Sequence, residues 1–327
     1  MPIRRPLLLA ALTLACAARA APVVLPLPPD WYPESLAAGP DGSFYVGSWR
    51  QGAVARVRPA DGRVDTLVAP GADGLGNAQG VLVDARRGAL WVCSGNIGFT
   101  TVPVGESALL RFDLATGAPR ARYPLPDAGY CNDLAEDDRG RLYVTDSLHP
   151  RILQWEDGAT ALTVWKEDDR LADRPVMGAF RALNGIAVDG SSVVVSVIAA
   201  VPWLLRVPVG ADGAPGQVER LQAPRTLRNV DAIRAWKPGR LVLFESNAFG
   251  DGPCGGQVTL VRIEGDRLAL RTIVRGLNDP SSGLVAGGRA WFIESKYALL
   301  THRRPEDGPV PAGVPFDLQS VPLPEDF

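Results

Sequence analysis

Apolar and polar positions alternate along this chain in a pattern that recurs six times. In each unit, an apolar β-rich run follows a turn of Gly, Asp or Ser, and shorter strand-like runs lie before and after it. The units begin at residues 34, 79, 132, 184, 231 and 282. Four short strands repeated about every fifty residues are typical of the blades of a β-propeller. The pattern therefore predicts an all-β fold, a six-bladed β-propeller with four antiparallel strands in each blade.

The two ends of the chain decide how such a propeller closes. The segment VVLPLP after residue 22 and the segment VPFDLQSVPLP near the C-terminus are both strand-like, and one of them is expected to complete the last blade. The run YALLTH at residues 297–302 is predicted to be the third strand of that blade. Separate blades cannot bury their faces, so residues 21–327 are expected to form a single domain.

The first twenty residues have the pattern of a targeting segment. Two arginines precede an apolar run, which ends in Ala18-Arg19-Ala20, the small-residue pattern of a cleavage site. Residues 1–20 are therefore interpreted as a signal peptide, and the mature protein is expected to be secreted or periplasmic. The alternative is a lipoprotein anchored at Cys16. No other apolar run is long enough to cross a bilayer, so no membrane span is expected.

The composition excludes one large class of partner. With 34 basic and 36 acidic residues, the formal net charge is −2, so the chain has no electrostatic footprint for nucleic acid. The 35 Gly and 29 Pro residues indicate many turns and few long helices. We expect a monomer whose partner is a small-molecule substrate.

The first residue of each unit is polar and carries a side-chain oxygen. The innermost strand of every blade runs along the central channel of a propeller, so these residues are expected to converge at one channel mouth. The six positions are Glu34, Gln79, Asn132, Asn184, Asp231 and Ser282. Two carboxylates and two amide carbonyls suit Ca²⁺, which takes about six to eight oxygen ligands. The pattern predicts one divalent metal ion, calcium, held by Glu34, Asn132, Asn184 and Asp231.

Each of these residues also has a simpler explanation when it is taken alone. Asn and Asp often begin strands through turn chemistry, because their side chains hydrogen-bond nearby backbone groups. Asn184-Gly185 is a turn sequence of this kind. The same polar choice at equivalent positions of different blades favours the metal site, while turn chemistry stays open as the alternative.

Four short motifs carry a resemblance to a known family. Their order and spacing resemble those of the gluconolactonase/regucalcin (senescence marker protein) family, a six-bladed propeller with one divalent metal at the channel. The motifs are Pro33-Glu34-Ser35, Asn132-Asp133, Asn184-Gly185 and Val230-Asp231-Ala232. The resemblance implies that Glu34, Asn184 and Asp231 are direct metal ligands. It also implies that Asn132 is a further ligand or a substrate contact, and that Asp231 is the general base.

The chain departs from the family pattern at several positions. Ser35 and Ala232 replace the glycine that follows each acid, and Leu134 follows Asn132-Asp133. Tyr130 stands where animal members of the family have a substrate-binding Arg. These departures concern the substrate rather than the metal ligands.

The predicted function is that of an exported, metal-dependent hydrolase of a lactone or related ester. The cation would polarise the carbonyl and stabilise the developing oxyanion. Asp231 and Asn132 are the candidate catalytic residues, the first as general base and the second to orient the substrate. Two alternatives stay open: a non-catalytic NHL-like propeller that binds a ligand or a protein, and a phosphotriesterase-like hydrolase.

Three cysteines follow the predicted signal peptide. Cys93 ends the second strand of the second unit, and Cys131 begins the first strand of the third. These positions are neighbours in a propeller, so the two cysteines are predicted to lie close enough for a disulfide. Cys254 is then expected to be the unpaired thiol.

Two long loops and three titratable residues are further candidates for the channel mouth. The loops at residues 95–106 and 247–256 are expected to cover it, because long loops in compact domains are often functional. Apolar walls are expected from Phe99, Phe249 and Trp203. Glu245 and Glu294 either line the pocket or belong to exposed loops, and His149 is interpreted as a surface-loop residue.

Overall fold

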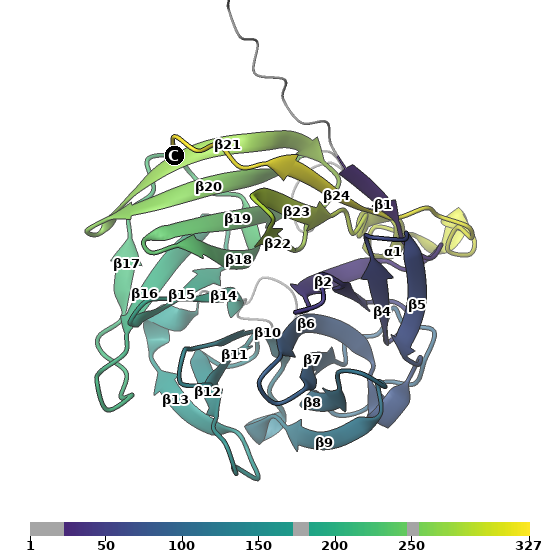
Figure 1. Cartoon of the computed structure of the whole chain (residues 1–327), viewed down its shortest axis with the longest axis horizontal. Helices are drawn as coiled ribbons and strands as arrows, with labels where there is room; N and C mark the ends of the chain where they lie inside the picture. The colour runs from purple at the N-terminus through teal and green to yellow at the C-terminus, as the bar shows by residue number, and fades with distance from the viewer. Residues whose placement is uncertain (1–22, 173–182, 247–254) are drawn as a thin grey trace, which may run out of the picture.

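The computed structural model describes residues 23–172, 183–246 and 255–327. In this part of the chain, six four-stranded antiparallel sheets stand around a central channel (Figure 1). The predicted six-bladed propeller is therefore confirmed. No helix among these residues is long and apolar enough to cross a membrane. The predicted signal peptide, residues 1–20, lies outside the described ranges.

Each of the first five blades is a meander of four consecutive strands, with the first strand at the channel and the fourth at the rim. The first two blades consist of β2 (Pro33–Ala38), β3 (Phe44–Ser48), β4 (Ala53–Arg58) and β5 (Arg63–Val68), then β6 (Asn77–Asp84), β7 (Ala89–Gly95), β8 (Ala108–Asp113) and β9 (Pro119–Pro124). The third blade consists of β10 (Cys131–Glu136), β11 (Leu142–Asp146), β12 (Arg151–Trp155) and β13 (Thr163–Glu167).

The fourth and fifth blades repeat this order. They consist of β14 (Leu183–Asp189), β15 (Ser192–Val197), β16 (Trp203–Pro208) and β17 (Glu219–Leu221), then β18 (Asn229–Lys237), β19 (Arg240–Ser246), β20 (Gly256–Glu264) and β21 (Arg267–Leu277). Strands β3, β7 and β11 are buried along their whole length, because neighbouring blades cover both faces of each sheet. This burial explains why the second strands read as continuous apolar runs in the sequence, whereas the rim strands are partly exposed.

The sixth blade is closed by both ends of the chain. Its strands lie in the order β22 (Gly283–Ala286), β23 (Arg289–Ile293), β24 (Asp317–Pro322) and β1 (Val23–Pro26). The two strand-like end segments therefore both enter the blade, where the sequence led us to expect only one. Pairing of β1 with β24 ties the start of the described chain to its end.

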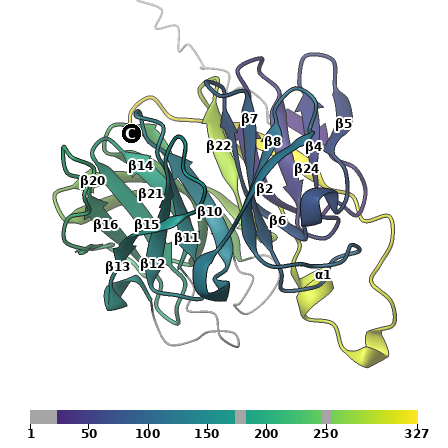
Figure 2. The same ribbon diagram turned by 90° about the horizontal axis from the view of Figure 1, so that it is seen from below.

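The prediction of a third strand at residues 297–302 is wrong. This run contains helix α1 (Ala298–Thr301), which lies beside the ends of the strands in Figure 2 and is not part of a sheet. Tyr297 and Leu300 are both buried in the core cluster shared by the first and last blades. Their spacing of three places both side chains on one face of a helical turn, whereas a strand would point them to opposite faces. The third position in the blade is filled by β24 instead.

A disulfide links the second blade to the third, as predicted from the positions of its cysteines. Cys93 in β7 and Cys131 in β10 are bonded, with Cα atoms 5.1 Å apart, and both are fully buried. The bond closes a loop with a sequence separation of 38 residues. Cys254 lies outside the described residues.

Removing this disulfide is expected to lower the free energy of unfolding by about 4 kcal/mol, the loop-closure value for a loop of this length. The double variant Cys93→Ala/Cys131→Ala tests this, because alanine adds no buried hydroxyl without a partner. Urea unfolding of the oxidised wild type and the variant measures the difference. Equal midpoints and equal slopes would contradict a stabilising role.

Candidate functional site

The predicted site residues sit at irregularities in the inner strands. Pairing between the first and second strands shifts register at Glu34, at Asn132-Asp133, at Asn184-Gly185 and at Asp231. A β-bulge leaves its extra residue out of the ladder and re-aims the side chain. A fifth blade has the same shift at Gln79-Gly80. The recurrence of the bulge in five blades explains how residues that begin strands can present their side chains to a common space.

The structure brings all four predicted ligands to one small cavity at the channel mouth. With the other lining residues, they come from all six inner strands or their immediate approaches; the others are Ser35, Gly80, Asp133, Ala232, Arg234, Ser281 and Ser282. The cavity has a volume of about 10 Å³. That is room for one water molecule or one metal ion.

Close approach of the inner strands requires glycine beside these side chains. A Cβ atom on Gly185 would lie 2.7 Å from the backbone oxygen of Asp231, and one on Gly80 would lie 2.8 Å from the Cα atom of Asp133. Both distances are too short for real contacts, so neither position has space for a larger residue. Glycine at these two positions therefore allows neighbouring bulges to pack against one another.

Asp231 is buried and has one oxygen satisfied. Its Oδ1 accepts a hydrogen bond from Asn184 Nδ2 at 2.8 Å. Its Oδ2 is also buried, and among the described residues it has no hydrogen-bond partner. The pKa of Asp231 is raised to about 7, chiefly because burial disfavours the charged form, and the carboxylates of Asp279 and Asp133 act in the same direction.

Glu34 has the same half-satisfied arrangement. Hydrogen bonding orients the Gln79 amide so that its nitrogen donates to Glu34 Oε1 at 3.0 Å, while its oxygen accepts from Trp49 Nε1 at 2.7 Å and from the Tyr130 hydroxyl. Glu34 Oε2 is buried without a partner among the described residues. Burial, followed by the carboxylates of Asp231 and Asp133, raises the pKa of Glu34 well above its ordinary value.

Gln79 and Tyr130 therefore take a different place from the one their sequence positions suggested. Gln79 does not line the cavity; its side chain hydrogen-bonds to Glu34 Oε1 instead. Tyr130, at the position of the family's substrate-binding Arg, is buried, and its hydroxyl bonds to Gln79. Sequence reasoning missed this support of Glu34, because its members lie in three different blades and share no local motif.

Asn132 is held through its amide nitrogen. Its Nδ2 donates to Ser147 Oγ at 2.9 Å, and that hydroxyl donates to the backbone oxygen of Leu183 at 2.6 Å. The second bond ties the third blade to β14 in the fourth. The side-chain nitrogens of Asn132 and Asn184 both donate hydrogen bonds within the protein. The carbonyl oxygen of each amide is therefore the atom that could coordinate a metal ion.

The donor set fits a hard divalent cation. A buried carboxylate oxygen without a partner is costly, and this cavity contains two, one on Glu34 and one on Asp231. Two carboxylates with two amide oxygens match the ligands that calcium prefers. Nowhere in the described ranges do three or more His, Cys, Asp and Glu residues gather as a metal site, so a cation in this cavity would need the amide oxygens as ligands too.

The other titratable candidates lie elsewhere. Glu245 is fully buried and accepts hydrogen bonds from both Arg225 terminal nitrogens, from the Arg228 backbone and from the side chains of Gln257 and Thr259. It is neither a pocket acid nor an exposed loop acid, the two alternatives that its sequence position left open. Glu294 accepts from the Asn278 backbone and from Gln319. His149 is partly exposed, as expected for a surface loop, and its Nδ1 lies 3.0 Å from Asp146 Oδ2.

The first long loop is anchored beside the Glu34 support. Phe99 is 45% exposed, and its ring stacks on Trp49 with the centroids 5.6 Å apart. Asn77 holds this arrangement, because its Nδ2 donates to the backbone oxygens of both Trp49 and Gly98. Trp203 instead packs against Arg220 at 4.8 Å. Phe249, and most of the second long loop, lie outside the described residues.

The metal-free protein is expected to be more stable at pH 5 than at pH 8. The folded-state pKa of Asp231, about 7, lies above the value of roughly 3.9 in an unfolded chain. The folded chain therefore binds this proton more tightly, and the resulting stability is lost as the pH rises toward 7. Thermal unfolding of chelator-treated protein measures the slope, and Asp231→Asn should flatten it. An unchanged slope in the variant would contradict the assignment.

Comparison with known proteins was made by sequence and by structure. No protein-family model matches the sequence, and no curated protein matches it either. Among solved structures, a gluconolactonase from Xanthomonas campestris is similar with a TM-score of 0.63 and 18% identity, covering 95% of this chain and 93% of that one.

Two other solved structures are similar to the same degree. The major allergen Mala s 1 of Malassezia sympodialis has a TM-score of 0.63 and 13% identity, over 91% of this chain and 95% of that one. A luciferin-regenerating enzyme has a TM-score of 0.62 and 13% identity, over 92% and 95%. The expected resemblance to gluconolactonase-like propellers is therefore confirmed for the fold. Proteins with such different names share this fold, so the function must be argued from the site.

Proposed function

We propose that this protein is a metal-dependent hydrolase of a lactone or related ester. The observation that carries the proposal is the cavity in which Glu34 and Asp231 each keep one buried carboxylate oxygen without a described partner, beside the amides of Asn132 and Asn184. These four residues would hold one divalent cation, calcium by the chemistry of its oxygen ligands. The structural similarity to a gluconolactonase supports the lactone as substrate class.

When bound, the cation would supply Lewis-acid polarisation of the substrate carbonyl. Asp231 accepts a proton from the attacking water, because its Oδ2 carries no other hydrogen bond from the described residues. The water oxygen then forms a bond to the carbonyl carbon. The ring C–O bond breaks, and the leaving alkoxide takes up the proton that Asp231 accepted from the water, which returns Asp231 to its carboxylate form. Asn184 fixes the Asp231 carboxylate through Oδ1, so the free oxygen keeps a constant direction.

Asn132 has the second role in this scheme. Its amide is anchored on Ser147, which prevents rotation and keeps the side chain at the cavity. An amide oxygen fixed in this way can accept a hydrogen bond from a hydroxyl group of the substrate and so orient it. The hydrogen bond to Ser147 is therefore part of the proposed substrate positioning.

The test is hydrolysis of a panel of aliphatic lactones, sugar lactones and aryl esters by chelator-treated protein, with and without added calcium. The proposal predicts calcium-dependent hydrolysis of at least one lactone. Tight calcium binding without hydrolysis of any member would favour the non-catalytic binding propeller. Hydrolysis confined to added phosphotriesters would favour the phosphotriesterase-like alternative.

A further inference from the structure

An ion pair crosses the channel directly beside the proposed metal site. Arg234 Nη1 donates to Asp133 Oδ2 at 2.8 Å, although the two residues are 101 positions apart in the chain. Their side chains are 18% and 5% exposed. Among the described residues that line the small cavity, Arg234 is the one cation.

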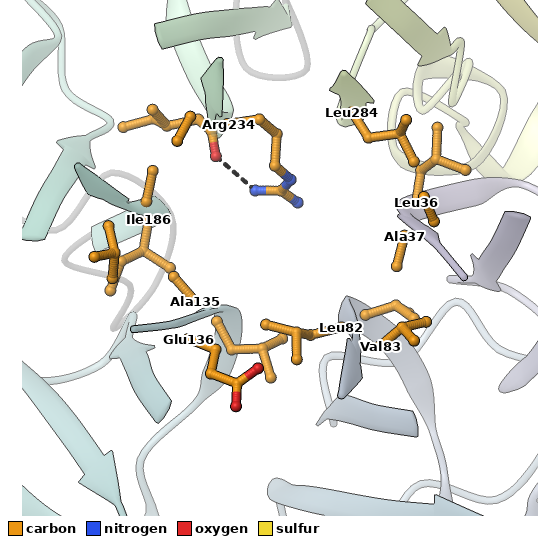
Figure 3. A pocket seen from close by; sticks show the side chains of 16 residues that line it. Leu36, Ala37, Leu82, Val83, Ala135, Glu136, Ile186, Arg234 and Leu284 are labelled. Atoms are coloured by element: carbon orange, nitrogen blue, oxygen red, sulfur yellow. Dashed lines mark hydrogen bonds between the residues drawn. The ribbon is translucent and has the colours of Figure 1, made fainter. Parts of the chain in front are cut away.

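The pair separates two parts of the channel. Arg234 also lines a second cavity of about 280 Å³, whose lining residues are mostly aliphatic, such as Leu36, Leu82 and Ile186. Figure 3 shows the Arg234 side chain extending from its strand into this part of the channel. The Asp133–Arg234 pair therefore forms a boundary between a polar chamber with the acids and an apolar chamber beyond it.

The pair also joins four blades across the channel axis. Asp133 belongs to the third blade, and its Oδ2 accepts from the Ile186 backbone of the fourth at 3.3 Å. Arg234 belongs to the fifth blade, and its Nη2 donates to Ser282 Oγ, beside the sixth, at 3.1 Å. The contact between Asp133 in the third blade and Arg234 in the fifth therefore joins two blades that are not neighbours.

Each member of the bridge lies within a few residues of a proposed ligand. Asp133 follows Asn132, Ile186 lies two residues after Asn184, and Arg234 lies three residues after Asp231. A displacement of any of these residues would therefore shift the neighbouring β-bulge, and with it the side chain of the proposed metal ligand in that bulge. Calcium sites are tuned by rigidity as well as by charge, so such a constraint acts on affinity.

We propose that the Asp133–Arg234 pair is a cross-channel clamp that positions Asn132, Asn184 and Asp231 and thereby sets the affinity of the site for its cation. The inference rests on the proposed function, because it needs a metal at this site. Both residues are positioning residues; neither is a ligand or a catalytic group. The rival role for Arg234 is simple charge balance among the neighbouring carboxylates.

The clamp and charge balance predict opposite changes in calcium affinity when Arg234 alone is removed, and they also differ when the whole ion pair is removed. Charge balance alone predicts that removing Arg234 tightens calcium binding, since the cavity becomes more negative. The double variant Asp133→Asn/Arg234→Met removes one charge of each sign, so the net charge of the site is unchanged. Replacing both partners also avoids leaving one buried charge unpaired. The clamp predicts that this variant binds calcium about 10–100-fold more weakly, the usual cost of losing an outer-sphere contact.

Calcium titration by calorimetry on chelator-treated full-length protein provides the measurement, with circular dichroism to confirm folding. The matched control is Asp84→Asn/Arg87→Met, which removes a second ion pair (2.7 Å) at the opposite end of the inner strands. This control should lower stability without changing calcium affinity. Arg234→Lys keeps the charge but supplies a single ammonium, which cannot reproduce the two-pronged contact with Asp133 and Ser282, so an intermediate loss is expected. This variant decides the question if the double variant does not fold.

Three outcomes are distinguishable. A weakened double variant beside an unchanged control supports the clamp. If the wild type binds calcium and the double variant and Arg234→Lys bind it with the same affinity as the wild type, the clamp is overturned. The proposed function is then left intact. A wild type that binds no divalent cation overturns the proposed function, and the clamp with it.

Discussion

Asp231→Asn is expected to lower the rate of lactone hydrolysis by about 10²–10⁴-fold, the usual cost of losing a general base. Asparagine keeps the shape of the side chain and one carbonyl oxygen, so the Asn184 contact at 2.8 Å can be replaced by a similar hydrogen bond. The change removes both the proton acceptor and one negative charge facing the cation. Excess calcium should therefore restore the part of the loss that comes from weaker metal binding, but not the part that comes from the missing base.

Steady-state kinetics at several calcium concentrations separate these two parts. Glu264→Gln is the matched control, because Glu264 is an exposed carboxylate at the end of β20 whose side chain pairs with Arg262, far from the cavity residues in sequence. It should have wild-type activity. Full recovery of Asp231→Asn at saturating calcium would mean that another group activates the water.

Glu34→Gln is expected to behave differently, because it removes charge but no base. A unit-charge contact at about 4 Å and an effective dielectric constant of about 20 is worth roughly 4 kcal/mol, so calcium affinity should fall on the order of 1,000-fold. High calcium should then recover most of the activity. The Gln79 amide, which donates to Glu34 Oε1 at 3.0 Å, can still find a carbonyl acceptor in the variant.

The same calcium series tests this variant. Folding is expected to be retained, because the buried unpartnered oxygen of Glu34 becomes an amide group in a cavity that already contains polar partners. A variant that stays inactive at saturating calcium while binding the ion would show that Glu34 has a role in the chemistry beyond holding the metal.

The fold was predictable because every blade repeats the same information. A buried second strand and a polar residue at the start of the first strand recur six times, so an error in one unit is corrected by the others. The mistake at residues 297–302 occurred where the chain leaves the repeat. A six-residue apolar run fits a strand or a helical turn equally well, and burial of Tyr297 and Leu300 against the closing blade decided for the helix.

The candidate ligands were predictable for the same reason, since the repeat fixes which residue of each blade faces the channel mouth. The contacts around these ligands were not predictable from the sequence. Gln79 has the sequence position of a ligand but hydrogen-bonds to Glu34 instead. Trp49 and Tyr130 both donate to the Gln79 oxygen, which leaves the nitrogen to donate to Glu34. Arg234 meets Asp133 from a blade two units away. Contacts of this kind depend on the closed ring, and no local pattern in the sequence signals them.

The proposed metal site is tested most directly by a calcium titration of chelator-treated wild-type protein, followed by calorimetry, with Glu34→Gln and Asp231→Asn measured alongside. We expect one calcium ion bound per chain and a large loss of affinity in both variants, with Glu264→Gln unchanged. Absence of binding by the wild type, or binding that neither acid substitution weakens, would contradict a metal site at the mouth of this channel.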